Sequence, residues 1–319
     1  MLGRVANTIY WMNRYLERAE NYARFMDVNF NLSLELPPNE EEQWKPLVII
    51  TGDWPLFESL HKKADKNKIL YFMAFEKKNP NSIYNCIVYA RENARAVRTE
   101  ITKEVWEQIN ALYYLVKHGL EKKRHNDVGL RQFFTDIKNG CQLLYGMYDA
   151  TISRNEGWSF AKLGQLIERA DKTSRVLDAK YHFLLASPSE VGSTLDLIQW
   201  AALLKSVSAY DMYRKKYGKL TSSSIAEFLI LDRDFPRSIL SCLIRAEQSI
   251  FNLSVSSTVL NSNAQKQLGN LKVQLEGIDI DEIVSSGMHE YLDDIQKKLN
   301  VISISIYEAF FFIEKNTTR

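Results

Sequence analysis

Two stretches of this 319-residue chain carry the same charged side chains at the same spacing. LERAENYARFMDV begins at Leu16 and IERADKTSRVLDA begins at Ile167, so the second stretch follows the first by 151 residues (167 − 16). At 3.6 residues per turn, each set of charges falls on one face of a helix. Carboxylates on such a face could transfer protons or bind Mg²⁺, and guanidiniums could hold an anion. The two stripes consist of Asn13, Glu17, Glu20, Arg24 and Asp27, and of Glu168, Asp171, Arg175 and Asp178.

Three interpretations of these stripes are open. A solvated face is the first, with Glu20–Arg24 and Asp171–Arg175 as i,i+4 pairs worth a few tenths of a kcal/mol. A solvated face tolerates exchange of Lys for Arg, yet the charged types persist in both stretches while the flanking residues differ. This persistence favours a position-specific role. That role is either a ligand site or a buried ion-pair network that fixes how two helices dock.

A third group of charges lies in YARENARAVRTE, where Arg91, Arg95 and Arg98 share one helix face with Glu92 between them. Neighbouring guanidiniums repel one another, so we expect these arginines to face the two acidic stripes or a bound anion. A second candidate for anion binding follows Pro236, at the start of a predicted helix with free backbone N–H groups. Its residues are Arg237, Ser238 and Arg245.

Composition and motifs exclude several classes of protein. The net charge of +2 gives no support for a nucleic-acid binder. No phosphate-binding glycine loop and no cofactor motif are present, so we expect no cofactor. A di-metal bundle would need two Glu-x-x-His motifs, and only Glu58–His61 fits, while nearby arginines disfavour Mg²⁺ at the stripes; we therefore expect no metal. Three widely spaced cysteines and the lack of a signal peptide or an 18-residue apolar run predict a cytoplasmic protein with no membrane contact.

Apolar residues recur at helical spacing almost throughout, which predicts an all-α fold. The stretch PLVIITGDW resembles a strand but is interpreted as helical because its surroundings are helical. We expect a loop at GLEKKRHNDVG and a linker at SPSEVGS. The helices are predicted at Tyr10–Leu34, Trp44–Thr51, Trp54–Lys63, after Pro80, and at Thr102–His118, Gly129–Arg154 and Gly157–Ala186.

The repetition extends beyond the charged stripes. FMAFEKKNPNSIYNCIVYA, from Phe72, matches FLILDRDFPRSILSCLIRA, from Phe228, and YDA at Tyr148 matches YEA at Tyr307. The landmarks keep their order and nearly keep their offset. We therefore predict an internally duplicated helical bundle, with residues 1–155 and 156–319 as similar halves packed about a pseudo-two-fold axis into one compact unit.

Five segments resemble the alpha-E family, an all-helical family named for its recurrent Glu-Arg motif. They are YWMNRYLERAENYAR, ARENARAVR, EVWEQIN, LGQLIERADKTSRVLD and FLILDRDFPRSI, and they cover essentially the whole chain. One departure is SAYDMYR at Ser208, where Asp211 stands in place of an expected Glu, which puts any contact made there in question. The resemblance implies a circularly permuted ATP-grasp protein as partner, often with a transglutaminase-like protease encoded nearby.

That genomic context suggests peptide ligation or peptide modification. We expect this chain to be a partner or substrate-presenting subunit of such a system. One alternative is an enzyme that acts on a peptide or an acyl-phosphate through its Glu/Arg cluster, with carboxylates as acid/base groups. The other alternative is a scaffold whose ionic cluster is purely structural. A scaffold should keep the cluster closed, whereas a ligand site should leave arginines with unpaired donors.

Overall fold

The computed structural model describes residues 1–35, 40–121, 127–182, 192–256 and 262–311. Every regular element in these ranges is a helix, so the predicted all-α class is confirmed. Ser and Thr side chains begin several of the helices by accepting the backbone N–H three residues ahead, as good N-caps do. The capping residues are Ser82, Ser193, Thr221 and Ser262.

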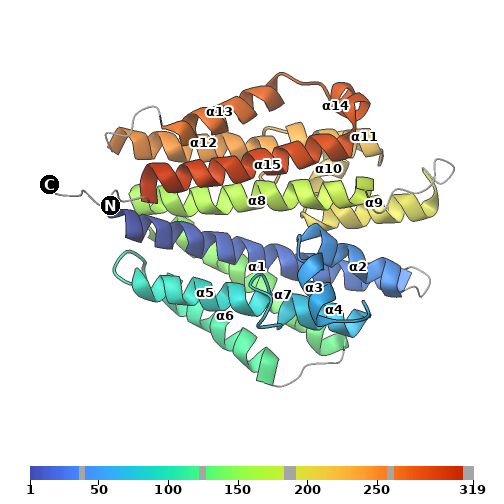
Figure 1. The fold of residues 1–319 in the computed structure, drawn as a ribbon, viewed down its shortest axis with the longest axis horizontal. Coiled ribbons are helices and arrows are strands. Elements are labelled where there is room, and N and C mark those ends of the chain that lie inside the picture. The colour runs from blue at the N-terminus through green and yellow to red at the C-terminus, as the bar shows by residue number, and fades with distance from the viewer. Residues whose placement is uncertain (36–39, 122–126, 183–191, 257–261, 312–319) are drawn as a thin grey trace.

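Two long helices, α1 (Gly3–Glu35) and α8 (Glu156–His182), form the centre of the molecule (Figure 1). They run parallel, because the amino group of Met1 contacts Glu156 at the start of α8. Gly164 allows their close approach, since a Cβ at this position would overlap the carbonyl oxygen of Tyr10. The two predicted charged helices are therefore direct neighbours.

A layer of three helices packs on each side of the central pair (Figure 1). On one side, two of the helices contact α1 and the third bridges them; on the other side, the same arrangement surrounds α8. A duplicated unit would produce this arrangement, and the duplication itself stays a prediction. The helices are α5 (Ile83–Ala96), α6 (Lys103–Glu121) and α7 (Asp127–Thr151) beside α1, and α12 (Ile239–Ser256), α13 (Asn263–Glu276) and α15 (Met288–Ile306) beside α8.

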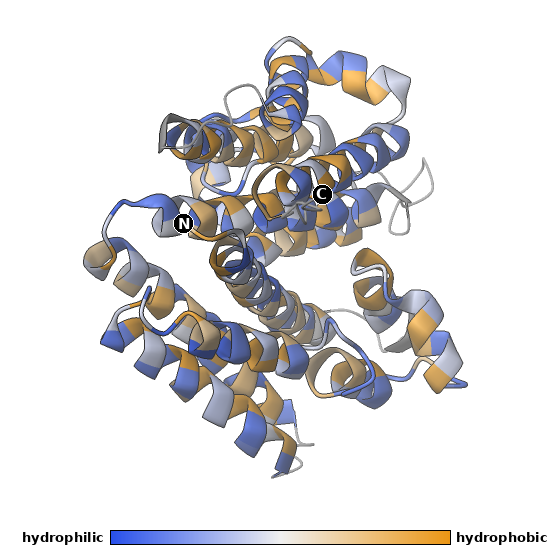
Figure 2. Ribbon diagram, turned by 60° about the vertical axis from the view of Figure 1, so that its left-hand side comes forward, coloured by the Kyte–Doolittle hydropathy of each residue, from blue (hydrophilic) through white to orange (hydrophobic). Residues whose placement is uncertain are grey.

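Shorter helices complete the fold near the carboxyl ends of α1 and α8. Apolar residues cover the helix faces that turn toward neighbouring helices, and hydrophilic residues cover much of the outside (Figure 2). These helices are α2 (Glu40–Ile50), α3 (Trp54–Leu60), α4 (Lys66–Ala74), α9 (Thr194–Ser206), α10 (Tyr210–Tyr217), α11 (Ser222–Leu231) and α14 (Ile280–Ser286). A π-helical turn (Tyr307–Phe311) lies at the amino end of α1.

The ambiguous stretch PLVIITGDW is helical in α2 up to Ile50, as expected. The centre of the predicted loop GLEKKRHNDVG, residues 122–126, lies outside the described residues, as does most of the linker SPSEVGS. Gly140 lies against the side chain of Leu112, which fits a close approach of α7 and α6. Gly146 of α7 has no such role, because within the described residues no atom of another helix lies within 4 Å of the place where its Cβ would be.

Candidate functional site

The Glu-Arg dipeptides of α1 and α8 exchange partners across the central helix pair. Glu17 accepts hydrogen bonds from Nε and Nη2 of Arg169, both at 2.8 Å. In the reciprocal pair, Glu168 accepts from Nε of Arg18 at 2.7 Å and from its Nη2 at 3.0 Å. Both pairs are two-pronged, which is the strongest geometry available to a guanidinium and a carboxylate. A two-fold relation between α1 and α8 would generate this exchange.

Additional donors saturate both central carboxylates. Glu168 also accepts from Arg14 Nε at 2.9 Å and lies 3.3 Å from Lys172 Nζ. Glu17 also accepts from the side chains of Gln165, Asn21 and Arg237, at 3.2, 3.1 and 3.3 Å. Both oxygens of each carboxylate therefore have a cationic or amide donor.

One helical turn further on, the two i,i+4 pairs of the stripes are present. Arg24 pairs with Glu20, whose second oxygen lies 3.0 Å from Arg237 Nη2. Asp171 accepts from Nε of Arg175 at 3.0 Å and from Lys172 at 2.8 Å. We call the eleven residues joined in this way the central network. They are Arg14, Glu17, Arg18, Glu20, Arg24, Glu168, Arg169, Asp171, Lys172, Arg175 and Arg237.

The ends of the stripes bind to the outer helices instead. Asp27 pairs with Lys138 of α7 at 2.7 Å, and Asp178 contacts His289 of α15 at 2.6 Å. The hydrogen bond that Asp178 accepts raises the pKa of His289. Asn13 is buried and donates to the carbonyl of Ile9 in its own helix. Asp27 and Asp178 therefore fasten α1 and α8 to their neighbouring layers, and all three residues lie outside the central network.

The carboxylates at the centre of the network are fully buried, and the pKa values of two of them are lowered. Glu17, Glu20 and Glu168 have 0% exposure, which rules out a solvated stripe. Burial alone would raise the pKa of Glu17, but the charges of Arg169 and Arg237 outweigh it and lower this pKa to about 2. Arg18, Lys172 and Arg14 overcome the effect of burial at Glu168 in the same way and hold its pKa well below the usual range. Deprotonated carboxylates that are already bound to guanidiniums are poor proton donors and acceptors.

Positive charge exceeds negative charge in the network. Seven of its residues are Arg or Lys and four are Glu or Asp. A fifth carboxylate, Asp53, adjoins it, because Asn81 accepts from Arg18 at 2.6 Å and donates to Asp53 at 2.7 Å. Counting Asp53 leaves an excess of two positive charges, and the most exposed cation of the network is Arg175, with 24% of its side chain exposed.

The expected contact between the third arginine group and the acidic stripes is wrong. Arg91 donates to Asn110 of α6 and lies 4.3 Å from the ring centre of Tyr113. Arg98 donates to the carbonyl of Ile101. The side chain of Arg95 is 70% exposed and pairs with Glu92 at 2.7 Å. Because α5 turns this face toward α6 and solvent, these arginines do not reach the acidic stripes.

The three residues of the predicted anion site at the start of α12 have three different roles. Arg237 is a member of the central network, where it binds Glu17 and Glu20. Ser238 caps α12 by accepting from the N–H of Ser241 at 3.1 Å. Arg245 lies exposed on α12. Asn81 holds the aligned place in the first half, where Lys172 supplies the cation for Glu168 and Asp171 and Asn81 links Arg18 to Asp53.

Four basic residues of the network were missed at the level of sequence: Arg14, Arg18, Arg169 and Lys172. A signal existed for two of them, because Arg18 and Arg169 repeat at the same offset as the glutamates. Arg14 and Lys172 have no such signal, since residues 165 and 21 are Gln and Asn. Both amides donate to Glu17, which is the counterpart of the Glu168 that Arg14 and Lys172 bind.

Other chemistry finds little support in the described residues. Burial raises the pKa of Cys86 to about 12 and of Cys242 to about 11, so neither thiol is an activated nucleophile. The described part of the chain gathers no three His, Cys, Asp or Glu side chains into a possible metal site.

Asp211 is exposed on α10, outside the network. Among the described helices, none is long and apolar enough to cross a membrane.

Comparison with known proteins places these observations in a family. The sequence model of the Alpha-E family, described as a predicted alpha-helical domain with a conserved ER motif, matches residues 1–311. Uncharacterised proteins of Mycobacterium bovis and Mycobacterium tuberculosis are 21% identical to this chain over 312 residues, which is 92% of this chain and 34% of theirs. The chain thus spans about a third of the length of these relatives. No solved structure matches it.

Proposed function

Because this chain belongs to the Alpha-E family, we propose that it is a non-catalytic or substrate-presenting partner of an ATP-grasp protein in peptide ligation or modification. The Glu-Arg motif of the family corresponds here to Glu17-Arg18 and Glu168-Arg169. In this proposal, the two dipeptides hold α1 and α8 in register, and the chemistry takes place on the partner.

The closed state of the central network carries this proposal. A general base must accept a substrate proton, and a general acid must hold a proton near the working pH. Glu17 has a pKa of about 2, and Arg169 binds both of its oxygens. Glu168 is bound in the same way by Arg18. These residues are suited to fixing a structure and not to turning over a substrate.

The lengths of the mycobacterial relatives agree with a partner role. The matched region is 34% of each relative, so about two thirds of each lies outside it. A domain that occurs within a longer protein commonly works together with other domains of that protein. The ATP-grasp identity of the partner comes from the family resemblance.

Reconstitution tests the proposal. The chain and the ATP-grasp protein encoded beside it would be mixed with ATP and candidate peptides, and ADP release and peptide products would be measured. We expect the chain to raise product formation by the partner and to release no ADP alone. Equal product formation with and without the chain, or turnover by the chain alone, would overturn the proposal. Glu17→Gln, assayed well below its melting temperature, should retain stimulation if this residue is structural.

The excess of positive charge favours a second candidate, binding of an anionic group such as a phosphate or a carboxylate. Arg175 is the suitable residue, because its side chain, which Asp171 binds at Nε, is the most exposed among the cations of the network, whereas Arg237 is buried between Glu17 and Glu20. Isothermal titration with phosphate and with acetyl phosphate tests this candidate. Binding that is lost in Arg175→Gln and kept in Arg245→Gln would support it, and absence of binding to the wild-type protein would reject it.

A further inference from the structure

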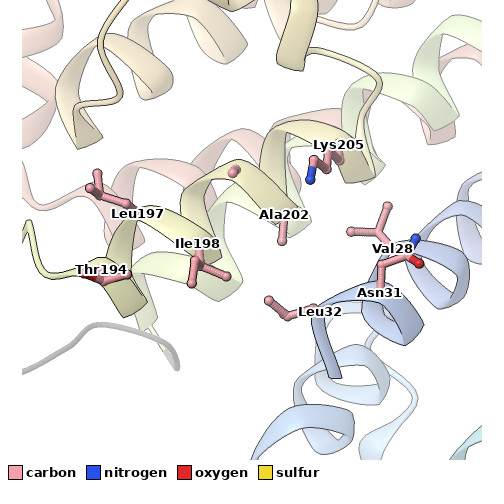
Figure 3. Close-up of a pocket in the computed structure, with 9 residues that line it drawn as sticks. Val28, Asn31, Leu32, Thr194, Leu197, Ile198, Ala202 and Lys205 are labelled. Carbon is pink, nitrogen blue, oxygen red and sulfur yellow. The ribbon is translucent and has the colours of Figure 1, made fainter. Parts of the chain in front are cut away.

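We infer that the groove between α1 and α9 binds an amphipathic helix of a partner protein, with an acidic residue near one end. This inference rests on the proposed partner role and names the surface that would serve it. The groove has a volume of about 450 Å³ and lies between the carboxyl-terminal part of α1 and the length of α9. Figure 3 shows Leu32 of α1 and Ile198 and Ala202 of α9 lining the space between the two helices.

α9 is apolar on two faces, and only one of them is buried. Trp200, Leu203 and Leu204 are buried against the rest of the molecule. On the face that lines the groove, Leu197 is 38% exposed and Ile198 is partly exposed. A helix that is apolar on all sides is normally covered on all sides. The second apolar face of α9 therefore fits an additional covering element.

Spacing along the groove favours a helix as that element. Val28 and Leu32 are four residues apart on α1, and Ile198, Ala202 and Lys205 follow on α9 at intervals of four and three. Two neighbouring stripes with this spacing form the holes into which a third helix can pack its side chains. The small side chain of Ala202 allows a close approach of that helix. The lining from Thr194 to Lys205 covers about 17 Å, which corresponds to roughly three helical turns.

Charge at one end of the groove determines the polarity of the occupant. Lys205 lines this end and lies over the ring of Tyr210, 5.6 Å from its centre. Asn31, which also lines the groove, accepts a hydrogen bond from Arg131. Within the described residues, neither Lys205 nor Arg131 has a carboxylate at ion-pair distance. Two cations beside an apolar groove select a helix with an acidic residue at that end over one with a basic residue.

A pair of designed peptides tests the groove directly, with no partner protein in the assay. Each peptide would be an amphipathic helix of roughly four turns with leucines at heptad spacing, ending in two glutamates or in two lysines. Fluorescence anisotropy should show that the wild-type protein prefers the acidic peptide. Lys205→Glu should weaken binding of this peptide about threefold to tenfold and strengthen binding of the basic peptide. Ala202→Arg should weaken both by at least about tenfold.

Matched variants on α13 control for general effects of charge and bulk. Lys266 and Val273 are exposed there, so Lys266→Glu and Val273→Arg should leave peptide binding unchanged. The inference would be overturned if the wild-type protein binds neither peptide, or if the α13 variants weaken binding as much as the groove variants. It would also be overturned if Ala202→Arg abolishes self-association measured by light scattering, because the groove would then be filled by a second copy of the chain.

The ATP-grasp partner separates this inference from the proposed function. If the partner binds wild type and Ala202→Arg equally, the groove inference fails and the partner role stands. If the partner fails to bind the wild-type chain while the acidic peptide binds in the groove, the partner assignment fails and the groove stands. Loss of partner binding in Ala202→Arg, with retention in Val273→Arg, supports both.

Discussion

Two stripes of arginines in adjacent segments differ in this protein: one is buried in ion pairs and the other is partly exposed. On α1, Arg14 and Arg18 cross to Glu168 of α8 and are nearly buried. Arg91 and Arg95 of α5, and Arg98 in the turn after it, have equally regular spacing, but they contact α6, nearby residues of their own segment and solvent. Both stripes look alike as sequence. The comparison shows that regular spacing identifies a charged face, whereas the partner helix decides whether that face becomes a structural network.

The largest effect is expected in the central network. Arg169→Met removes the two-pronged partner of Glu17 and leaves a carboxylate of 0% exposure without its main counter-charge. Removing one partner of a buried pair costs on the order of 3–5 kcal/mol. Urea denaturation should therefore show a large loss of stability. A change of less than about 1 kcal/mol would mean that water reaches the network.

Acid should act on the same residues. The pKa of Glu17 is about 2 in the folded protein against an ordinary value of 4.5, so the unfolded chain binds a proton first as the pH falls. The stabilisation from this carboxylate, roughly 3 kcal/mol, is present above about pH 5 and is lost as the pH falls from 4.5 toward 2. Denaturation midpoints measured between pH 7 and pH 3 should fall steeply in wild type. The decline should be shallower in Glu17→Gln, and parallel curves would contradict the assignment.

The spacing between α1 and α8 offers a smaller test. A methyl group at Gly164 would overlap the backbone of Tyr10, so Gly164→Ala should force the helices apart and destabilise by about 1–3 kcal/mol. Gly146→Ala is the matched control, because its added methyl meets no atom within 4 Å. This control should be neutral or stabilise by up to about 1 kcal/mol, as expected for Ala in a helix. Equal melting temperatures for the two variants would contradict the close approach.

The smallest effect should come from the α5 stripe. Arg95 is 70% exposed and its partner Glu92 is also partly exposed, so the pair is screened by water. Arg95→Met should change stability by less than about 0.5 kcal/mol in thermal denaturation. A loss comparable to that of Arg169→Met would place Arg95 in the network and remove the contrast between the two stripes.

Much of the fold follows from local patterns, and much of the network does not. Apolar spacing identified the helices at Tyr10–Leu34 and Gly157–Ala186 and the charged faces that meet. The pairing of arginines with glutamates depends on the parallel packing of α1 on α8. The sequence around Gly164 does not reveal this packing. Arg237 was expected to bind an anion, and only the packing of α12 against α1 brings it to Glu17 and Glu20. The groove beside α9 depends on how α1 and α9, which are far apart in the sequence, pack in space. The periodicity of apolar residues does not predict this packing.

The central claim is that the reciprocal Glu-Arg pairs join α1 and α8 as a structural unit. A double-mutant cycle on Glu17→Gln and Arg169→Met, measured by urea denaturation at pH 7, tests it most directly. If the two side chains bind each other in a buried site, the double variant should be no less stable than Arg169→Met alone, with a coupling energy of at least about 2 kcal/mol. Additive losses, with a coupling energy near zero, would contradict the account.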